Sequence, residues 1–110
     1  MAVRAMIKRW IPKGKEKEAI QVITALRMLA SRYPGYISGE TLQSIEEQEE
    51  FLVISTWQTL GAWNTFFADP KRKALQDRID QLQGRTTEYK IYQYPESFQV
   101  PLEEDIKFFK

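Results

Sequence analysis

The stretch TWQTLGAWNTFFADPKRKALQ, residues 56–76, holds most of the side chains in this chain that could do chemistry on a small molecule. Trp63 and Asn64 are adjacent hydrogen-bond donors, and Phe66 and Phe67 follow them with aromatic surface. Such a surface could hold a flat ring while the donors stabilise charge or move a proton. If Asn64 is buried among these rings, its amide must find hydrogen-bond partners, which makes Asn64 the most informative of these residues.

Each candidate also has a purely structural interpretation, which the sequence leaves open. Trp57 ends an apolar strand and fits a hydrophobic core as well as a site. Trp63 and Phe67 lie four residues apart, which is the spacing of a helix face that packs on a sheet. Asn64 and Gln76 are polar residues in helical segments, and an exposed position on the helix surface accounts for each of them.

The composition excludes several kinds of site. The 110 residues include no histidine and no cysteine, so the chain cannot form disulfides, zinc–thiolate centres or thiol nucleophiles. It has no glycine-rich phosphate loop, and its carboxylates fall mostly on turns and helix surfaces without the spacing of metal ligands. We therefore expect neither a metal site nor a cofactor site.

The charge and hydropathy of the chain are those of an ordinary globular protein. Its net charge is +1, which gives no general case for binding nucleic acid or a membrane. The N-terminus, MAVRAMIKRW, carries charges every few residues and lacks the apolar core of a signal peptide. No run approaches the ~18 apolar residues that a membrane-spanning helix needs. We expect a cytoplasmic protein.

Basic residues cluster in two places. The first cluster lies within residues 1–17, where Glu16 is the only acidic residue. It consists of Arg4, Lys8, Arg9, Lys13, Lys15 and Lys17. We interpret it as a solvated end of the molecule, with a site for an anionic ligand as the alternative. The second cluster, KRK at 71–73, falls at a predicted helix N-terminus, and we expect it to be solvated as well.

Alternating periodicities along the chain predict its elements. Residues 2–11 alternate apolar and polar side chains, which indicates a strand, whereas 15–32 carries an apolar stripe at the 3.6-residue period of a helix. Asp69 followed by Pro70 is typical of a helix start. The prediction comprises strands at 2–11, 36–44, 51–57 and 87–94, a helix at 15–32, a short helix at 60–68 and a further helix from 70 to the C-cap Gly84.

The order strand, helix, strand, strand, helix, strand is the pattern of a ferredoxin-like α+β sandwich. In that fold, right-handed crossovers place both helical segments on one face of a four-stranded antiparallel sheet. One domain, residues 1–95, accounts for the pattern. The C-terminal tail, residues 96–110, is too apolar for a disordered end, so we expect it to dock on its own sheet or on a partner subunit.

The helices of such a sandwich cover only one face of the sheet. Strand 51–57 is apolar on both faces, with Leu52 and Ile54 opposite Val53 and Trp57. An uncovered face with several such groups would be a large exposed apolar patch. We therefore predict a homodimer that joins two sheets face to face about a two-fold axis; the alternative is that the C-terminal tail covers the sheet.

Two stretches, PGYISGETL at 34–42 and EEFLVISTWQTLGAWNTFFADPKRKAL at 49–75, resemble the antibiotic biosynthesis monooxygenase-like family of dimeric α+β barrels. The shared features are a Pro-Gly-aromatic turn before the second strand, a strand that ends in Trp57 and an aromatic-rich short helix after it. The resemblance covers about residues 3–94. It implies a cavity between sheet and helices in each subunit, with the sheets meeting at the dimer interface.

Haem degradation, one activity of that family, is not expected. The resemblance places Ile7, Phe66 and Gln76 where haem-degrading members carry an asparagine, a tryptophan and an iron-ligating histidine. Gln76 cannot supply imidazole ligation, and Ile7 cannot donate a hydrogen bond from its side chain.

The polyketide-type members of the family need neither metal nor flavin, because an electron-rich phenol, once deprotonated, can itself pass an electron to oxygen. The resemblance thus implies a small cofactor-independent monooxygenase that acts on a planar aromatic or quinone-like molecule. Trp63 and Asn64 are then the expected catalytic residues. The expected substrate-binding residues are Trp57, Phe66, Phe67, Gln76 and Tyr36, of which Tyr36 also fits dimer packing. The alternative is a dimer on the same barrel that binds a small molecule, or has a structural role, without turnover.

Overall fold

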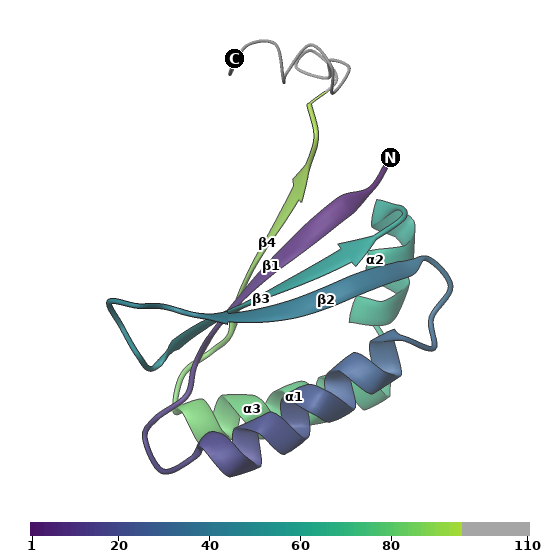
Figure 1. Cartoon of the computed structure of the whole chain (residues 1–110). Helices are drawn as coiled ribbons and strands as arrows, with labels where there is room; N and C mark the ends of the chain where they lie inside the picture. Colours follow the sequence, from purple (N-terminus) through teal and green to yellow (C-terminus); the bar gives the residue numbers. More distant parts are fainter. Residues whose placement is uncertain (96–110) are drawn as a thin grey trace, which may run out of the picture.

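The computed structural model describes residues 1–95 and contains every element that the sequence predicts (Figure 1). In chain order these are β1 (Val3–Trp10), α1 (Glu16–Ala30), β2 (Tyr36–Gln43), β3 (Glu50–Trp57), α2 (Leu60–Phe67), α3 (Pro70–Gln83) and β4 (Glu88–Gln93). The predicted boundaries differ from these by no more than two residues. The expected docking of the tail at 96–110 lies outside the described residues.

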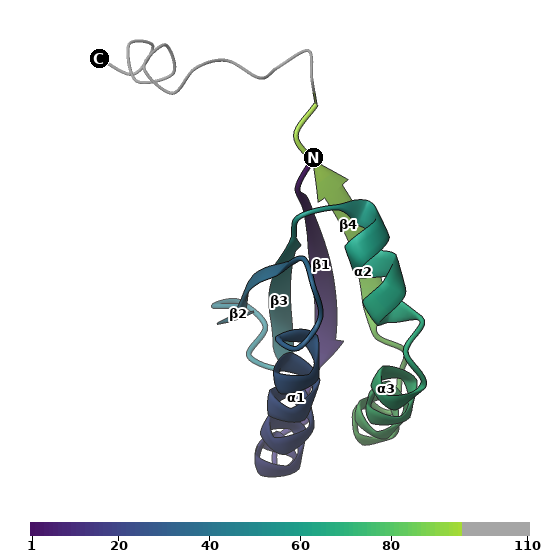
Figure 2. The same cartoon turned by 90° about the vertical axis from the view of Figure 1, so that its right-hand side faces the viewer.

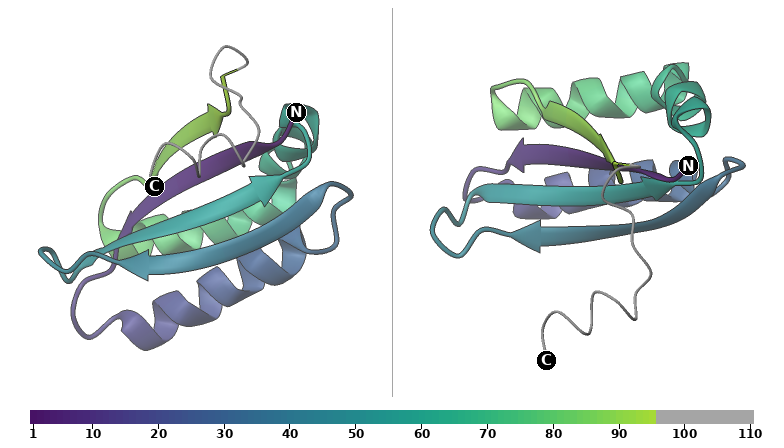
Figure 3. Two further views of the ribbon diagram at one scale, coloured as in Figure 1. Left: turned by 45° about the horizontal axis from the view of Figure 1, so that its top comes forward. Right: turned by 90° about the horizontal axis from the view of Figure 1, so that it is seen from above.

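The sheet has the order β2-β3-β1-β4, and all neighbouring strands are antiparallel. Both long helices, α1 and α3, lie on the same face of the sheet (Figure 2). The short helix α2 lies on that side near the end of β3 (Figure 1). This arrangement confirms the predicted ferredoxin-like fold. Figure 3 shows the other face of the sheet, over which no described helix packs. No helix within residues 1–95 has the length and hydropathy to cross a membrane.

Consecutive caps divide the helical connection into α2 and α3. The Oγ1 of Thr59 accepts a hydrogen bond from the backbone N–H of Ala62 at 3.1 Å, which starts α2. The Oδ1 of Asp69 accepts from the N–H of Lys71 at 2.6 Å, and Pro70 occupies the first turn of α3. Because a cap residue sits outside the helix that it starts, α2 cannot run on into α3, and the two helices take different directions.

Two apolar clusters make up the core. The first joins β1 and β3 to α2 and is centred on Trp57, whose exposed fraction is 0%. The second joins α1 to α3 around Ile79, which is equally buried. Together these clusters hold the helices against one side of the sheet. Members of both clusters line the candidate site, together with several polar side chains.

The open face of the sheet carries apolar side chains between charged ones. The registers place Met6 beside Ile54 and Leu42 beside Leu52, all on the face opposite the helices because side chains alternate along a strand. Leu42 is 48% exposed and Tyr92, at the other edge of this face, is 45% exposed. This face therefore has the apolar patches that the dimer prediction requires.

Candidate functional site

A small cavity lies between the helix-covered face of the sheet and the helices. Its volume is about 40 Å³, which is room for about three water molecules. Part of its wall is apolar, and the polar part consists of Arg9, Arg27, Tyr36, Ser55, Arg72 and Tyr89. The described lining includes no acidic side chain.

Aromatic side chains from α2 form one wall of the cavity. Trp63 and Phe66 line it, and both are buried. Behind them, Trp57 stacks on Phe66 with ring centroids 5.1 Å apart, and its indole N–H donates to the Oγ of Ser55 at 2.8 Å. Each aromatic pair of this kind contributes about 0.5–1.5 kcal/mol beyond its buried area. The wall is thus a packed, hydrogen-bonded unit.

Two guanidinium groups reach the cavity from different elements. Arg9 lies on β1 and Arg72 on the first turns of α3, with exposed fractions of 4% and 5%. The Nε of Arg72 donates to the backbone oxygen of Phe67 at 2.7 Å, and its guanidinium lies 4.1 Å from the centre of the Phe67 ring. Burial of two arginines in a chain of this size is costly in free energy unless each guanidinium is hydrogen-bonded and its charge is paired with an anionic group.

Gln76 of α3 and Tyr89 of β4 orient both guanidiniums. The Nη1 of Arg9 donates to the Oε1 of Gln76 at 3.0 Å. The Tyr89 hydroxyl donates to the same oxygen at 2.6 Å and accepts from the Nη1 of Arg72 at 3.1 Å. The amide nitrogen of Gln76 donates to the Oδ1 of Asp80 at 2.8 Å, so both ends of this amide are fixed. Neutral side chains therefore hold the two positive charges in place.

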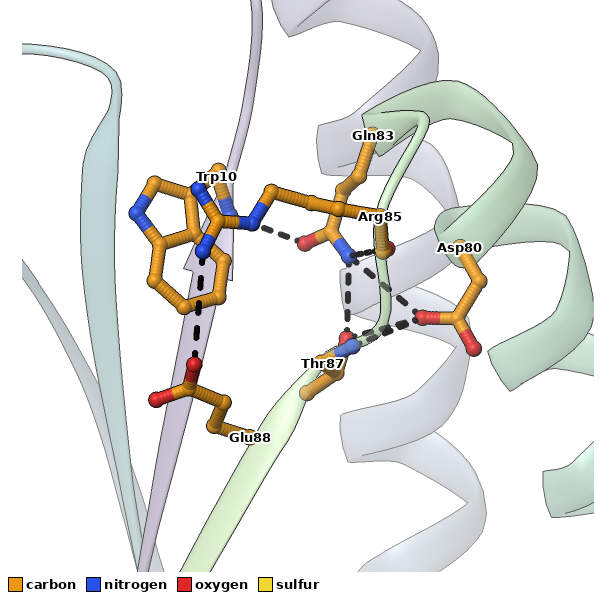
Figure 4. A network of polar contacts seen from close by, with 6 residues as sticks. All are labelled: Trp10, Asp80, Gln83, Arg85, Thr87 and Glu88. Carbon is orange, nitrogen blue, oxygen red and sulfur yellow. Dashed lines mark hydrogen bonds and ion pairs between the residues drawn. The ribbon is translucent and has the colours of Figure 1, made fainter.

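Asp80 anchors further polar contacts where α3 leads into β4 (Figure 4). Its Oδ1 accepts from the backbone N–H of Thr87 at 3.1 Å and from the Thr87 hydroxyl at 3.0 Å. Gln83 donates to the Thr87 Oγ1 at 3.1 Å and accepts from the backbone N–H of Trp10 at 2.9 Å. These contacts tie the end of α3 to β1 and β4, the strands that carry Arg9 and Tyr89. Within residues 1–95, acidic side chains form no group that could hold a metal ion.

Burial shifts the pKa values of two groups at the cavity, Arg9 and Tyr89. Desolvation lowers the pKa of Arg9, while the nearby Tyr89 and Asp80 act to raise it; an arginine nevertheless stays charged at neutral pH. Desolvation also raises the pKa of Tyr89, although the charges of Arg9 and Arg72 act to lower it. Tyr89 is therefore a neutral hydrogen-bonding group at pH 7 and not a base.

The rim of the cavity lies between α1 and β2. Arg27 and Tyr36 are half-buried there, and the Nη2 of Arg27 donates to the Oγ1 of Thr41 at 2.6 Å. A Cβ at Gly39 would lie 2.7 Å from the Tyr36 hydroxyl oxygen and 3.2 Å from the Nε of Arg27. Because glycine has no Cβ, position 39 leaves space for the Tyr36 hydroxyl and the Arg27 guanidinium at the rim.

The structure brings only part of the predicted site together. Trp63, Phe66 and Tyr36 line the cavity as expected. Gln76 is 7% exposed, so its interpretation as a surface residue is wrong, but it orients the arginines and does not line the cavity. Phe67 does not line the cavity; it packs edge-on against the lining residue Tyr89, with ring centroids 5.1 Å apart.

Trp57 and Asn64 lie away from the cavity. Trp57 is fully buried behind the aromatic wall, as its core interpretation predicts. Asn64 is exposed on α2 and is not among the lining residues. No contact with the cavity supports a substrate-binding role for Trp57 or a catalytic role for Asn64, and the catalytic role of Trp63 stays a prediction.

Sequence reasoning missed the two buried arginines. The solvated interpretation of the basic clusters is wrong for Arg9 and for Arg72. A signal was present in each case: Arg9 continues the buried alternation that includes Ile7 on β1. Arg72 lies seven residues before Ile79, two helical turns along the buried stripe of α3. The periodicity places both residues on buried faces, but a charged side chain is usually assigned to the surface, so the pattern is easily overlooked.

The sheet order, the helix-covered face and the cavity beneath it define an α+β protein of the ferredoxin-like class. The sequence model of the family Antibiotic biosynthesis monooxygenase matches residues 2–78. The chain therefore belongs to the antibiotic biosynthesis monooxygenase family. No curated protein sequence matches it.

Solved structures share this fold at low sequence identity. A conserved protein from Methanosarcina mazei Go1 superposes with a TM-score of 0.79 at 19% identity, covering 86% of this chain and 94% of that one. A mutant of SnoaB, a cofactor-independent oxygenase from Streptomyces nogalater, superposes with a TM-score of 0.76 at 16% identity, covering 90% of this chain and 98% of that one. At such identities the likeness concerns the fold alone.

Proposed function

We propose that this protein is a small monooxygenase that acts, without a cofactor, on a planar aromatic or quinone-like molecule held between the sheet and the helices. One observation carries the proposal: the cavity is lined both by a packed aromatic wall, Trp63 and Phe66, and by polar groups from β1, α3 and β4. Membership of the monooxygenase family supports it, as does the fold shared with SnoaB, a cofactor-independent oxygenase.

The chemistry has to come from the substrate. A hydroquinone or anthrone that loses a proton can pass one electron to O₂, and the resulting radical pair combines to a ring hydroperoxide. Loss of water from that hydroperoxide leaves a carbonyl on the ring, so one oxygen atom enters the product, the other leaves as water, and no further reductant is needed. The protein has to hold the ring, exclude water and stabilise the anion.

A ring substrate needs more room than the cavity provides. Ligand sites commonly enclose about 300–1,000 Å³, whereas this cavity measures about 40 Å³. Entry of a substrate therefore requires movement of rim side chains, of which Arg27 and Tyr36 are half-buried. The aromatic wall is much less able to yield, because Phe66 and Trp63 are packed against the fully buried Trp57.

We also propose that the protein is a homodimer joined through the open face of the sheet. Burial of one large apolar side chain contributes about 1.5–3 kcal/mol. Leu42 and Tyr92 are each close to half-exposed on this face, and Leu52, Ile54 and Met6 lie between them. A two-fold pairing of these faces would cover the patch while the cavity, on the helical side, stays separate in each subunit.

The test of turnover is oxygen uptake by the purified protein, freed of metal by a chelator, with a panel of hydroquinones and anthrones. We expect uptake above the uncatalysed rate, with one atom of ¹⁸O₂ in the product and one in water. Trp63→Phe should lower kcat about tenfold to a hundredfold through misplacement of the ring. Trp10→Phe, at a half-buried tryptophan outside the cavity lining, is the matched control.

Two further results would separate the proposal from its rivals. Absence of uptake across the panel, with binding retained, would leave a binding protein without turnover. Asn64→Ala tests the location of the site: unchanged kcat agrees with a site inside the cavity, from which Asn64 is absent. Loss of turnover in Asn64→Ala, with Trp63→Phe unaffected, would move the site to the outer side of α2 and refute the cavity as the active site.

A further inference from the structure

The cavity carries more positive charge than the surrounding protein balances. Three arginines, Arg9, Arg27 and Arg72, are among its lining residues, and no carboxylate is. Within residues 1–95 the only ion pair is Arg85 with Glu88, outside the cavity. Buried arginines in proteins are normally paired with an acid, so this cavity departs from the usual pattern.

The nearest acid does not neutralise both guanidiniums. Asp80 interacts favourably with Arg9, but its Oδ1 accepts hydrogen bonds from Gln76 and Thr87. It makes no ion pair with Arg9 or Arg72 within the part of the chain described. One carboxylate facing two buried guanidiniums leaves one positive charge in excess.

Arg9 also has hydrogen-bonding capacity that the fold does not use. Its side chain is 4% exposed, and its Nη1 donates to Gln76 and Thr87. Its Nε is buried and has no hydrogen-bond partner among the described residues, and it is the only buried side-chain nitrogen or oxygen there in that condition. A native fold rarely keeps such a group without a reason. A ligand oxygen that reached this Nε would supply the missing acceptor.

We propose that the cavity binds its ligand as an aromatic oxyanion, an aromatic ring bearing a carboxylate or a phenolate oxygen, held by Arg9 and Arg72 with the ring against Trp63 and Phe66. Guanidinium groups suit this chemistry because their planar N–H donors match a carboxylate or other oxyanion. The ring is specified by the aromatic side chains Trp63 and Phe66, which line the same cavity. The inference deepens the proposed function by naming the substrate class of the same cavity.

The lining residues also suit a substrate that reacts as an anion. The chain has no histidine, and the polar lining consists of arginine, tyrosine and serine side chains, with no carboxylate to act as a general base. Removal of a proton from a bound phenol would thus depend on stabilising the anion with nearby positive charge. Arg9 and Arg72 provide that charge without a general base.

The experiment is an NMR titration of the ¹⁵N-labelled full-length protein with benzoate, its neutral isostere benzamide, and phenol. We expect benzoate to bind about tenfold to a hundredfold tighter than benzamide, as hydrogen bonds to a charged group imply. Arg9→Met and Arg72→Met should each abolish most of that preference. Arg78→Met, at an exposed arginine of α3 outside the cavity lining, is the matched control and should leave it unchanged.

Two further measurements distinguish a carboxylate ligand from a phenolate ligand and provide a conservative variant in case Arg9→Met does not fold. Calorimetry in two buffers of different ionisation enthalpy should show proton release when phenol binds and none when benzoate binds; proton release on phenol binding assigns the phenolate, and its absence restricts the site to carboxylates. Arg9→Lys keeps the charge but not the planar donors, and should retain part of the preference for benzoate.

Equal affinity for benzoate and benzamide, or no binding of any probe at millimolar concentration, would overturn the inference. A preference for benzoate that survives in a folded Arg9→Met protein would overturn the role of Arg9. These outcomes concern binding and do not depend on oxygen uptake. A protein that binds benzoate as expected but consumes no oxygen would refute the proposed turnover alone.

Discussion

Gly35 is the point at which the turn before β2 touches the first turn of α2. Its φ angle is +90°, and a Cβ added there would lie 2.7 Å from the Cβ of Ala62. Its backbone oxygen accepts from the N–H of Gln58 at 2.7 Å. Because α2 carries the aromatic wall of the cavity, this close approach helps to set the position of Trp63 and Phe66.

Gly35→Ala should therefore be strongly destabilising. A left-handed backbone costs an L-residue about 1–2 kcal/mol, and overpacking against Ala62 adds about 1–3 kcal/mol. The expected loss is about 2–5 kcal/mol in the free energy of unfolding, measured by urea denaturation at fixed protein concentration, since any association changes the apparent stability. Gly14 is a matched control: its φ is +89° and nothing lies within 4 Å of its Cβ position. Gly14→Ala should cost only the backbone part, about 1–2 kcal/mol.

A double-mutant cycle isolates the contact. Ala62→Gly removes the obstructing Cβ at a cost of about 1 kcal/mol in helix propensity. Combined with Gly35→Ala it should recover about 1–3 kcal/mol relative to the sum of the single changes. A coupling energy below about 0.5 kcal/mol, the limit for independent sites, would refute the reasoning. So would equal losses in Gly14→Ala and Gly35→Ala.

Three other predictions concern the acid limit of stability, the dimer and the rim. The hydrogen bond from Tyr33 lowers the pKa of Asp69, so this capping carboxylate stabilises the fold at pH values above its ordinary pKa of about 3.9 and loses that contribution as the pH falls through the lower pKa of the folded state. Asp69→Asn should therefore reduce the loss of stability on acidification below about pH 4. An unchanged dependence of the free energy of unfolding on acid pH, measured by urea denaturation, would contradict this. Leu42→Glu, at a side chain 48% exposed on the open face, should turn a sedimenting dimer into a folded monomer at micromolar concentration; a wild-type protein that already sediments as a monomer would remove the dimer proposal. Gly39→Ala should crowd Tyr36 at the rim and weaken benzoate binding about tenfold, or ~1.4 kcal/mol, with little effect on unfolding; unchanged affinity would place ligand entry elsewhere.

Local signals in the chain account for most of the fold. The alternation in β1 and the stripe in α1 depend on which side chains share a face, a property of neighbouring residues alone. The caps Thr59 and Asp69 act within a few residues of themselves, and the structure confirms both. The strand order then follows from the restricted set of topologies open to such an order of elements.

The candidate site was much harder to predict, because its polar residues meet only in the folded chain. The sequence predicts Trp63 and Phe66 at the site, since aromatic side chains on a short helix can form the wall of a cavity or part of a core, and both residues line the cavity. Arg9 and Gln76, in contrast, are hydrogen-bonded across 67 residues of sequence. No local pattern links them, and each has a simpler explanation as an exposed polar residue.

The sequence by itself determined the elements and their buried faces, because periodicity, capping and turn chemistry act over a few residues at a time. The match of residues 2–78 to a family model determined the family. Only the tertiary structure decided that Arg9 and Arg72 are buried at one cavity while Asn64 is exposed. The physical reason is that burial of a charge depends on what the opposite elements bring to it. Here β4 and α3 bring Tyr89 and Gln76, which hold the guanidiniums without neutralising them.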